Sequence, residues 1–197
     1  MECCGKQIWT NLTKETLGRL MIGRPDEVIR GAVKANWDAI AKPLDGMGRF
    51  EEMTAQIGAI TGDERLDLSE KAVLIFCADN GIVAEGVSQA GQEVTLAVAK
   101  SMAKNASSVG RMARFAGADT IPVDIGINSD LTIDGVLDKK IAHGTRDFLI
   151  EPAMSEEETL GAIETGIALV AECKDKGYRI LATGEMGIGN TTTSSAV

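Results

Sequence analysis

Apolar residues in the first third of the chain recur at the spacing of an amphipathic helix. Val28, Val33 and Trp37 fall on one face of a predicted helix, with polar residues between them. Pro25 suits the first turn because its fixed φ is already helical, and we expect Pro43 to end the helix. Such a helix buries its apolar face only against a partner surface.

A second amphipathic helix is predicted directly after the first. We expect Asp45 to cap its N-terminus and Gly62 to break it, and Phe50 and Met53 lie on its apolar face. The sequence therefore predicts a helical segment over residues 1–62.

Beyond residue 70 the pattern changes to short, continuous apolar runs. Residues 71–77 form one such run, which is typical of a parallel strand covered on both faces. Residues 120–125 form another, although Pro122 lacks the N–H that a central strand donates to its neighbour. Between the two runs we expect one helix over residues 92–116.

The clearest helix signal begins at Ser155, which forms a capping box with Glu158. Gly177 is the predicted C-cap, and a further strand is expected over residues 178–183. Strands that alternate with helices are typical of a doubly wound α/β domain with a mostly parallel sheet. We predict this domain over residues 63–197.

Charge and composition exclude several classes of partner. Asp and Glu total 29 against 20 Lys and Arg, so a net charge of −9 disfavours nucleic acid and anionic membranes. No apolar run approaches the roughly 20 residues that span a bilayer, and the N-terminus lacks a secretory signal. The cysteines lack the paired spacing of a zinc or redox motif: Cys3, Cys4, Cys77 and Cys173. We therefore expect a cytoplasmic protein with free thiols.

Glycines gather after the last predicted strand, where ligands bind in open α/β sheets. Gly184, Gly187 and Gly189 let the backbone approach a ligand, and Asn190 and Thr191 can open a helix that favours phosphate. Asn190 stands where a P-loop requires lysine, which disfavours an ATPase. From loop composition alone, a phosphate site and a purely structural turn both remain open.

A second polar connection, residues 78–95, follows the first predicted strand. It offers Asp79, Glu85, Ser88 and Gln92, and loops of this length inside a compact domain are often functional. The alternative is that Asp79 makes a local Asx turn, which is common at strand ends.

Together these two segments resemble the nicotinate-nucleotide:dimethylbenzimidazole phosphoribosyltransferase family. The similar motifs are ADNGIVAEGVS from residue 78, QEVT from residue 92 and GEMGIGNTT from residue 184. The segment KPLDGMGRFE, from residue 42, resembles a diverged form of the family's N-terminal Lys-Pro segment. The resemblance extends to residue 197, and because family members are considerably longer, we expect a C-terminal part to be missing.

The resemblance implies transfer of the 5-phosphoribosyl group from nicotinate mononucleotide to 5,6-dimethylbenzimidazole, which gives α-ribazole phosphate and nicotinate without a metal or cofactor. It implies that the loop after the last predicted strand holds the phosphate through Gly184, Gly187, Gly189, Asn190 and Thr191. Glu185 would stabilise positive charge at the ribose carbon. Ser88 and Gln92 would line the benzimidazole slot, and we add Asp79 as a further substrate contact. The family's general base, a glutamate, would lie beyond Val197.

The family's architecture implies a homodimer whose small helical domain is built from both ends of the chain. With half of that domain absent, we expect the helices before Thr61 to expose apolar side chains. Two alternatives remain beside the enzyme. One is a non-catalytic module of the same ancestry that binds nucleotide or benzimidazole, and the other is an unrelated phosphate-binding α/β protein such as a kinase.

Overall fold

The computed structural model describes residues 11–197, which belong to two compact units. One unit is Gly18–Leu68, and the other combines Ser69–Val197 with the described part of Met1–Leu17. Cys3 and Cys4, two of the expected free thiols, lie outside the described residues, whereas Cys77 and Cys173 are free and buried. No helix in the described part of the chain is long and apolar enough to span a membrane.

The unit Gly18–Leu68 contains two helices, α2 (Glu27–Asp38) and α3 (Arg49–Thr61). The expected start at Pro25 is wrong by two residues, because the Asp26 carboxylate caps α2 by accepting from the N–H groups of Val28 and Ile29. The helix also ends at Asp38, five residues before the expected stop at Pro43.

The expected N-cap of α3 is also wrong. Asp45 has a φ of +54° and lies in the preceding turn, where its carboxylate bonds to the Lys34 ammonium instead of capping a helix. Gly48 takes the N-cap position with a φ of +55°, and Gly62 ends α3 in the left-handed conformation, as predicted. The lysine partner of Asp45 lies 11 residues away, beyond the reach of a local capping rule.

The two helices pack on small residues. Val33 is 4% exposed, and a Cβ on Gly58 would lie 2.6 Å from Val33 Cγ2, so α3 approaches α2 closely there. Trp37 donates to Thr54 Oγ1 at 2.7 Å and meets the Phe50 ring edge-on at 5.8 Å between centroids.

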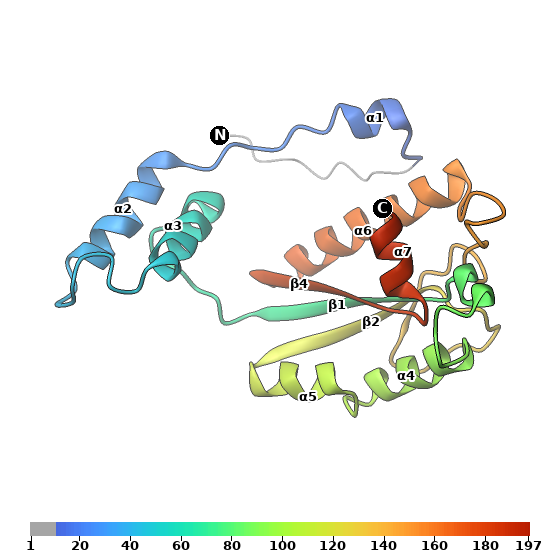
Figure 1. Cartoon of the computed structure of the whole chain (residues 1–197). Helices are drawn as coiled ribbons and strands as arrows, with labels where there is room; N and C mark the ends of the chain where they lie inside the picture. The colour runs from blue at the N-terminus through green and yellow to red at the C-terminus, as the bar shows by residue number, and fades with distance from the viewer. Residues whose placement is uncertain (1–10) are drawn as a thin grey trace. The chain divides into compact units, whose positions relative to one another are not determined.

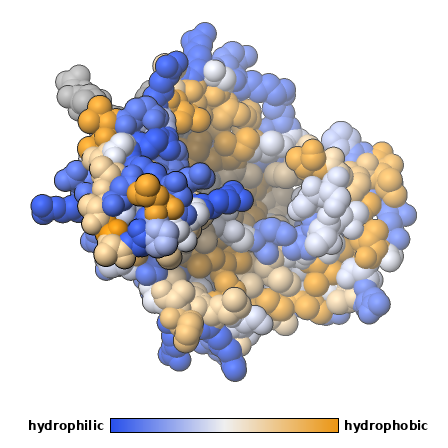
Figure 2. All heavy atoms as spheres, turned by 60° about the vertical axis from the view of Figure 1, so that its left-hand side comes forward, coloured by the Kyte–Doolittle hydropathy of each residue, from blue (hydrophilic) through white to orange (hydrophobic). Residues whose placement is uncertain are grey.

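The expectation that these helices expose apolar side chains is confirmed. Val28 is 81% exposed, Phe50 51%, Met53 58% and Ile60 65%. The face in Figure 2 shows apolar residues at the surface among polar ones.

The other unit is built on a parallel sheet, as predicted. Its strands are β1 (Lys71–Ala78), β2 (Ala118–Gly126), β3 (Leu137–Asp138) and β4 (Ile180–Met186), in the order β3-β2-β1-β4. Helices α4 (Glu93–Ala103) and α5 (Ser108–Phe115) cover one face, and α6 (Glu156–Asp175) and α7 (Asn190–Ala196) cover the other (Figure 1). A short α1 (Lys14–Gly18) and a 3-10 helix, η1 (Gly81–Glu85), complete the elements.

Two expectations for this unit need correction, whereas the strand expected over residues 120–125 is confirmed as part of β2. The single helix over residues 92–116 is two helices, because Asn105 adopts a φ of +52° and Ser107 caps α5 by accepting from Gly110 N. Pro122 does lie in an interior strand; among the described residues β3 pairs only with Val123 and Asp124, so β2 has no partner beside Pro122 on that side. The last strand starts at residue 180 and continues to residue 186, three residues further than expected.

The core lies between the sheet and the helices that cover it. Leu74, Cys77 and Ala99 are fully buried, and Leu169 of α6 is 1% exposed. The predicted capping box at the start of α6 is confirmed in both directions: Glu158 N donates to Ser155 Oγ, and Ser155 N donates to the Glu158 carboxylate. This packing fixes the carboxyl ends of β1 and β4 side by side.

Candidate functional site

The candidate site lies where β1 and β4 end. The two strands are parallel neighbours, with Cys77 opposite Met186, so the segments that follow them leave the sheet at the same edge. The segment after β1 begins with Asp79 and Asn80, and the one after β4 is the short turn 187–189. Ligands of open α/β sheets bind at this edge.

The turn 187–189 has no room for side chains at its two glycines. A Cβ on Gly187 would lie 2.0 Å from the Ala78 carbonyl oxygen. Gly189 is the N-cap of α7 with a φ of +85°, and a Cβ there would lie 2.8 Å from Val83 Cγ2. The turn therefore packs directly on the segment that follows β1.

Gly184 has a different role from the one its spacing suggested. It lies in β4 opposite Ile75, and the nearest atom to a Cβ there would be Ile75 Cγ1 at 4.0 Å. The expected loop over residues 184–191 is thus a turn of three residues between a strand and a helix.

Glu185, Asn190 and Thr191 form a connected chain of hydrogen bonds on the surface. Asn190 donates from Nδ2 to Glu185 Oε1 at 2.6 Å, and its Oδ1 accepts from Thr191 N at 2.8 Å. Asn190 N in turn donates to the Gly187 carbonyl. A phosphate that uses the Thr191 amide must therefore displace the Asn190 side chain, which is bound to Glu185.

Gln92 is brought to this turn through Asn80. Gln92 donates from Nε2 to the Asn80 carbonyl at 3.0 Å, and Asn80 Nδ2 donates to the Ile188 carbonyl at 3.1 Å. The fully buried Thr95 accepts from Ile188 N at 3.2 Å. Asn80 and Thr95 were not predicted as site residues. Their only signal in the sequence was that Asn80 lies directly after a predicted strand and Thr95 lies within the QEVT motif.

Ser88 and Asp79 have contacts that do not include the turn. Ser88 Oγ accepts from Ala90 N at 3.2 Å in a local turn. Asp79 is 2% exposed, and its Oδ2 accepts from Asn128 N at 2.8 Å, so the local Asx turn considered for Asp79 is wrong. Its buried Oδ1 has no hydrogen-bond partner within the described part of the chain.

Glu85 lies at the end of η1, near the loop that contains Asp147. A hydrogen bond with the Asp147 carboxyl and the proximity of the two like charges raise the pKa of Glu85. The start of η1 is held close to the same loop, because Gly81 N donates to Thr145 Oγ1 at 3.1 Å.

An apolar pocket of about 130 Å³ opens beside the carboxyl ends of β1 and β2. Its lining includes Ala78, Gly126, Ile141, Met154, Glu158 and Ala162. Arg146 bonds to Glu158 and lowers the pKa of that carboxyl to about 2, so the pocket carries one ionised group. Ser88 and Gln92, the predicted slot residues, do not line it.

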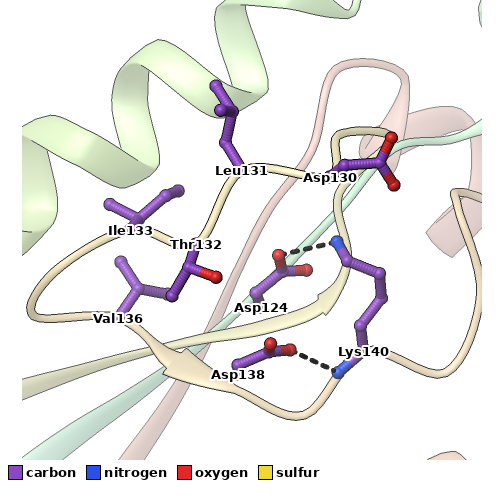
Figure 3. A pocket seen from close by; sticks show the side chains of 8 residues that line it. All are labelled: Asp124, Asp130, Leu131, Thr132, Ile133, Val136, Asp138 and Lys140. Carbon is purple, nitrogen blue, oxygen red and sulfur yellow. Dashed lines mark hydrogen bonds and ion pairs between the residues drawn. The ribbon is translucent and has the colours of Figure 1, made fainter.

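A second pocket, of about 30 Å³, is shown in Figure 3. The Lys140 ammonium donates to Asp124 Oδ2 at 2.7 Å and to the Ile127 carbonyl at 2.5 Å. Because the space holds about one water and the charges are paired, this is a structural ion pair and not a nucleotide site.

Three carboxylates of the helical unit, those of Asp38, Asp45 and Glu51, lie close enough to hold a metal ion. The Lys34 ammonium contacts all three. A cationic side chain thus already neutralises the cluster.

The chain is similar to known transferases over most of its length. A family model described as "Phosphoribosyltransferase" matches residues 22–197. The nicotinate-nucleotide–dimethylbenzimidazole phosphoribosyltransferase of Clostridium tetani is 43% identical over 186 residues, which are 94% of this chain and 51% of that protein. The protein of the same name from Geotalea uraniireducens is 42% identical over 188 residues, 95% of this chain and 53% of that protein.

Comparison with solved structures indicates the same family. The crystal structure of the phosphoribosyltransferase of this name from Thermus thermophilus matches with a TM-score of 0.82 and 31% identity, over 87% of this chain and 52% of that one. The chain spans about half the length of the curated relatives it matches. An unrelated kinase is excluded, and the resemblance noted from the motifs is confirmed. The chain belongs to the phosphoribosyltransferase family that includes the nicotinate-nucleotide–dimethylbenzimidazole enzymes.

Proposed function

We propose that this chain carries the nucleotide-binding part of an enzyme that transfers the 5-phosphoribosyl group from nicotinate mononucleotide to 5,6-dimethylbenzimidazole. The products are α-ribazole phosphate and nicotinate. The observation that carries the proposal is the meeting of the two family motifs at the ends of β1 and β4, where Gln92, Asn80 and Ile188 form one hydrogen-bonded chain.

The phosphate-binding part of the proposal rests on the turn after β4. Gly187 and Gly189 keep that turn free of side chains, and Asn190 and Thr191 supply polar groups directly after it. Gly184 would contribute only through the shape of the strand end.

The reaction breaks the bond between the ribose carbon and the nicotinate nitrogen and forms a bond to a benzimidazole nitrogen, and the general base predicted beyond Val197 would accept the N–H proton that the benzimidazole ring loses. Positive charge develops at that carbon, and the exposed carboxylate of Glu185, which is bound to Asn190, is available to stabilise it. Gln92 and Ser88 remain the proposed contacts to the benzimidazole, and Asp79 a further substrate contact.

Other features stay predictions. They include the cytoplasmic location, the homodimer, the division into residues 1–62 and 63–197, and a general base beyond Val197. The non-catalytic module is retained as the alternative outcome of the test below.

The test has two arms on the purified chain. Calorimetry measures the affinity for nicotinate mononucleotide, and mass spectrometry detects α-ribazole phosphate after dimethylbenzimidazole is added. Gly187→Val is expected to abolish both signals, because its side chain overlaps the Ala78 carbonyl. Gly166→Ala, in a helix position with open space around it, is the matched control.

Product formation by the chain and by Gly166→Ala, and none by Gly187→Val, supports the transferase. Nucleotide binding without product shows that this chain is either an incomplete enzyme that lacks its general base or the non-catalytic module. Absence of nucleotide binding contradicts the transferase and leaves only a module that binds benzimidazole.

A further inference from the structure

Three polar groups of Asn80 each connect to a different segment of the candidate site. Its Nδ2 donates to the Ile188 carbonyl at 3.1 Å, its Oδ1 accepts from Thr193 Oγ1 at 2.9 Å, and its main-chain carbonyl accepts from Gln92 at 3.0 Å. The residue is 8% exposed, so these bonds are largely shielded from water. The segment after β1 is thereby tied to the turn after β4, to α7 and to the start of α4.

Two hydrogen bonds hold the middle residue of the turn 187–189, one through its main-chain N–H group and one through its main-chain carbonyl. Thr95 accepts from Ile188 N, and Asn80 donates to the Ile188 carbonyl. The flanking glycines leave space for this contact, since a Cβ on Gly187 would lie 2.7 Å from Asn80 Nδ2 and one on Gly189 would lie 3.5 Å from Asn80 Cβ.

We propose that Asn80 is a positioning residue that holds the proposed phosphate turn and Gln92 in one fixed geometry. This inference rests on the proposed function. It adds a residue that acts by fixing the turn and not by contact with the ribose carbon or the benzimidazole nitrogen. A flexible turn would lose conformational freedom when it binds phosphate, whereas a turn fixed in advance has already lost it. Asn80 should therefore raise the affinity for the phosphorylated nucleotide.

The side-chain amide is suited to this position because it offers a donor and an acceptor together. Asn80→Asp keeps the acceptor for Thr193 and loses the donor to Ile188. It also places a carboxylate against the Ile188 carbonyl oxygen. Asn80→Ala loses both bonds, and Thr193→Val loses the bond between Thr193 and Asn80 at nearly constant volume.

The first measurement uses NMR to monitor amide hydrogen exchange in the whole chain. In Asn80→Ala we expect Ile188 and Thr192 to exchange about tenfold faster than in the wild type, because the turn opens more often. Phe76, in the middle of β1, should keep its wild-type rate, which shows that the sheet is intact.

The second measurement is calorimetric affinity for nicotinate mononucleotide and for the corresponding nucleoside, which lacks the phosphate. Asn80→Ala and Asn80→Asp should weaken nucleotide binding by about tenfold and nucleoside binding much less. Thr193→Val should show a smaller loss, and Thr193→Ser, which keeps the hydroxyl, should restore wild-type affinity.

Equal losses for nucleotide and nucleoside, or unchanged exchange at Ile188 in Asn80→Ala, would overturn the inference. If Asn80→Ala fails to fold, the comparison of Thr193→Val with Thr193→Ser decides, and equal affinities there overturn it too. Failure of the wild type to bind nicotinate mononucleotide overturns the proposed function instead; hydrogen exchange still decides whether Asn80 fixes the turn.

Discussion

At the scale of single residues, the three glycines of the last motif have three different roles. Gly187 is required by close backbone contact, Gly189 by its positive φ, and Gly184 pairs within β4 with little around it. Sequence spacing treats them alike, because the close contact of Gly187 is made with Ala78, which is more than a hundred residues away.

We expect Gly187→Ala to destabilise the protein by about 1–3 kcal/mol, because the new methyl group overlaps the Ala78 carbonyl and the backbone must shift. Gly166→Ala, in the middle of α6, should be stabilising by about 0.5–1 kcal/mol, since alanine favours the helix. Urea unfolding of both variants checks the two signs. Equal stability of the two variants would contradict the proposed packing of the turn.

At the scale of elements, local signals predicted what local interactions determine. The capping box of Ser155 and the buried run of β1 were found from sequence because their causes lie within a few neighbouring residues. The start of α2 was misplaced by two residues although its cap, Asp26, bonds locally to Val28 and Ile29. The start of α3 and the break at Asn105 were missed because their partners lie further along the chain. Asp45 contacts Lys34, 11 residues away, and Asn105 bonds to Thr120, 15 residues away.

Ser155→Ala should cost about 1 kcal/mol of stability, because Glu158 N loses its side-chain acceptor at the start of α6. Thermal unfolding followed by circular dichroism measures the effect, with Ser155→Thr as the variant that keeps a capping hydroxyl. A loss as large in Ser155→Thr as in Ser155→Ala would argue against the capping role.

The packing of α2 on α3 should depend on pH through Glu51. The Lys42 ammonium at 2.8 Å and the Met47 N–H lower the pKa of Glu51 to about 2. Because the unfolded chain binds this proton more tightly, the stabilisation is complete above the ordinary carboxyl pKa of about 4.3 and is lost as pH falls towards 2.

Trp37 fluorescence in a Trp9→Phe background reports on this unit during thermal unfolding. Glu51→Gln should melt at a lower temperature than its parent near neutral pH, and the difference should shrink as the pH falls through the window between the two pKa values. A difference that stays constant down to the lower end of that window would contradict the assigned ion pair.

At the scale of the whole molecule, the parallel sheet was predicted from strands that alternate with helices, and the family was predicted from three motifs. The arrangement of the candidate site did not, because its joining contacts link residues far apart in sequence. Asn80 bonds to Thr193 across 113 positions, and Gln92 reaches the turn only through Asn80. The predicted strands indicate where the edge of the sheet lies. Which residues contact one another at that edge depends on how the chain folds.

The most direct test of the account is a crystal structure of this chain with nicotinate mononucleotide. We expect the phosphate at the turn 187–189 and the start of α7, with the Asn190 side chain moved away from the Thr191 amide. The ribose should face Glu185. A nucleotide bound elsewhere, for example in the apolar pocket beside α6, with the turn and Asn190 unchanged, would contradict the central claim.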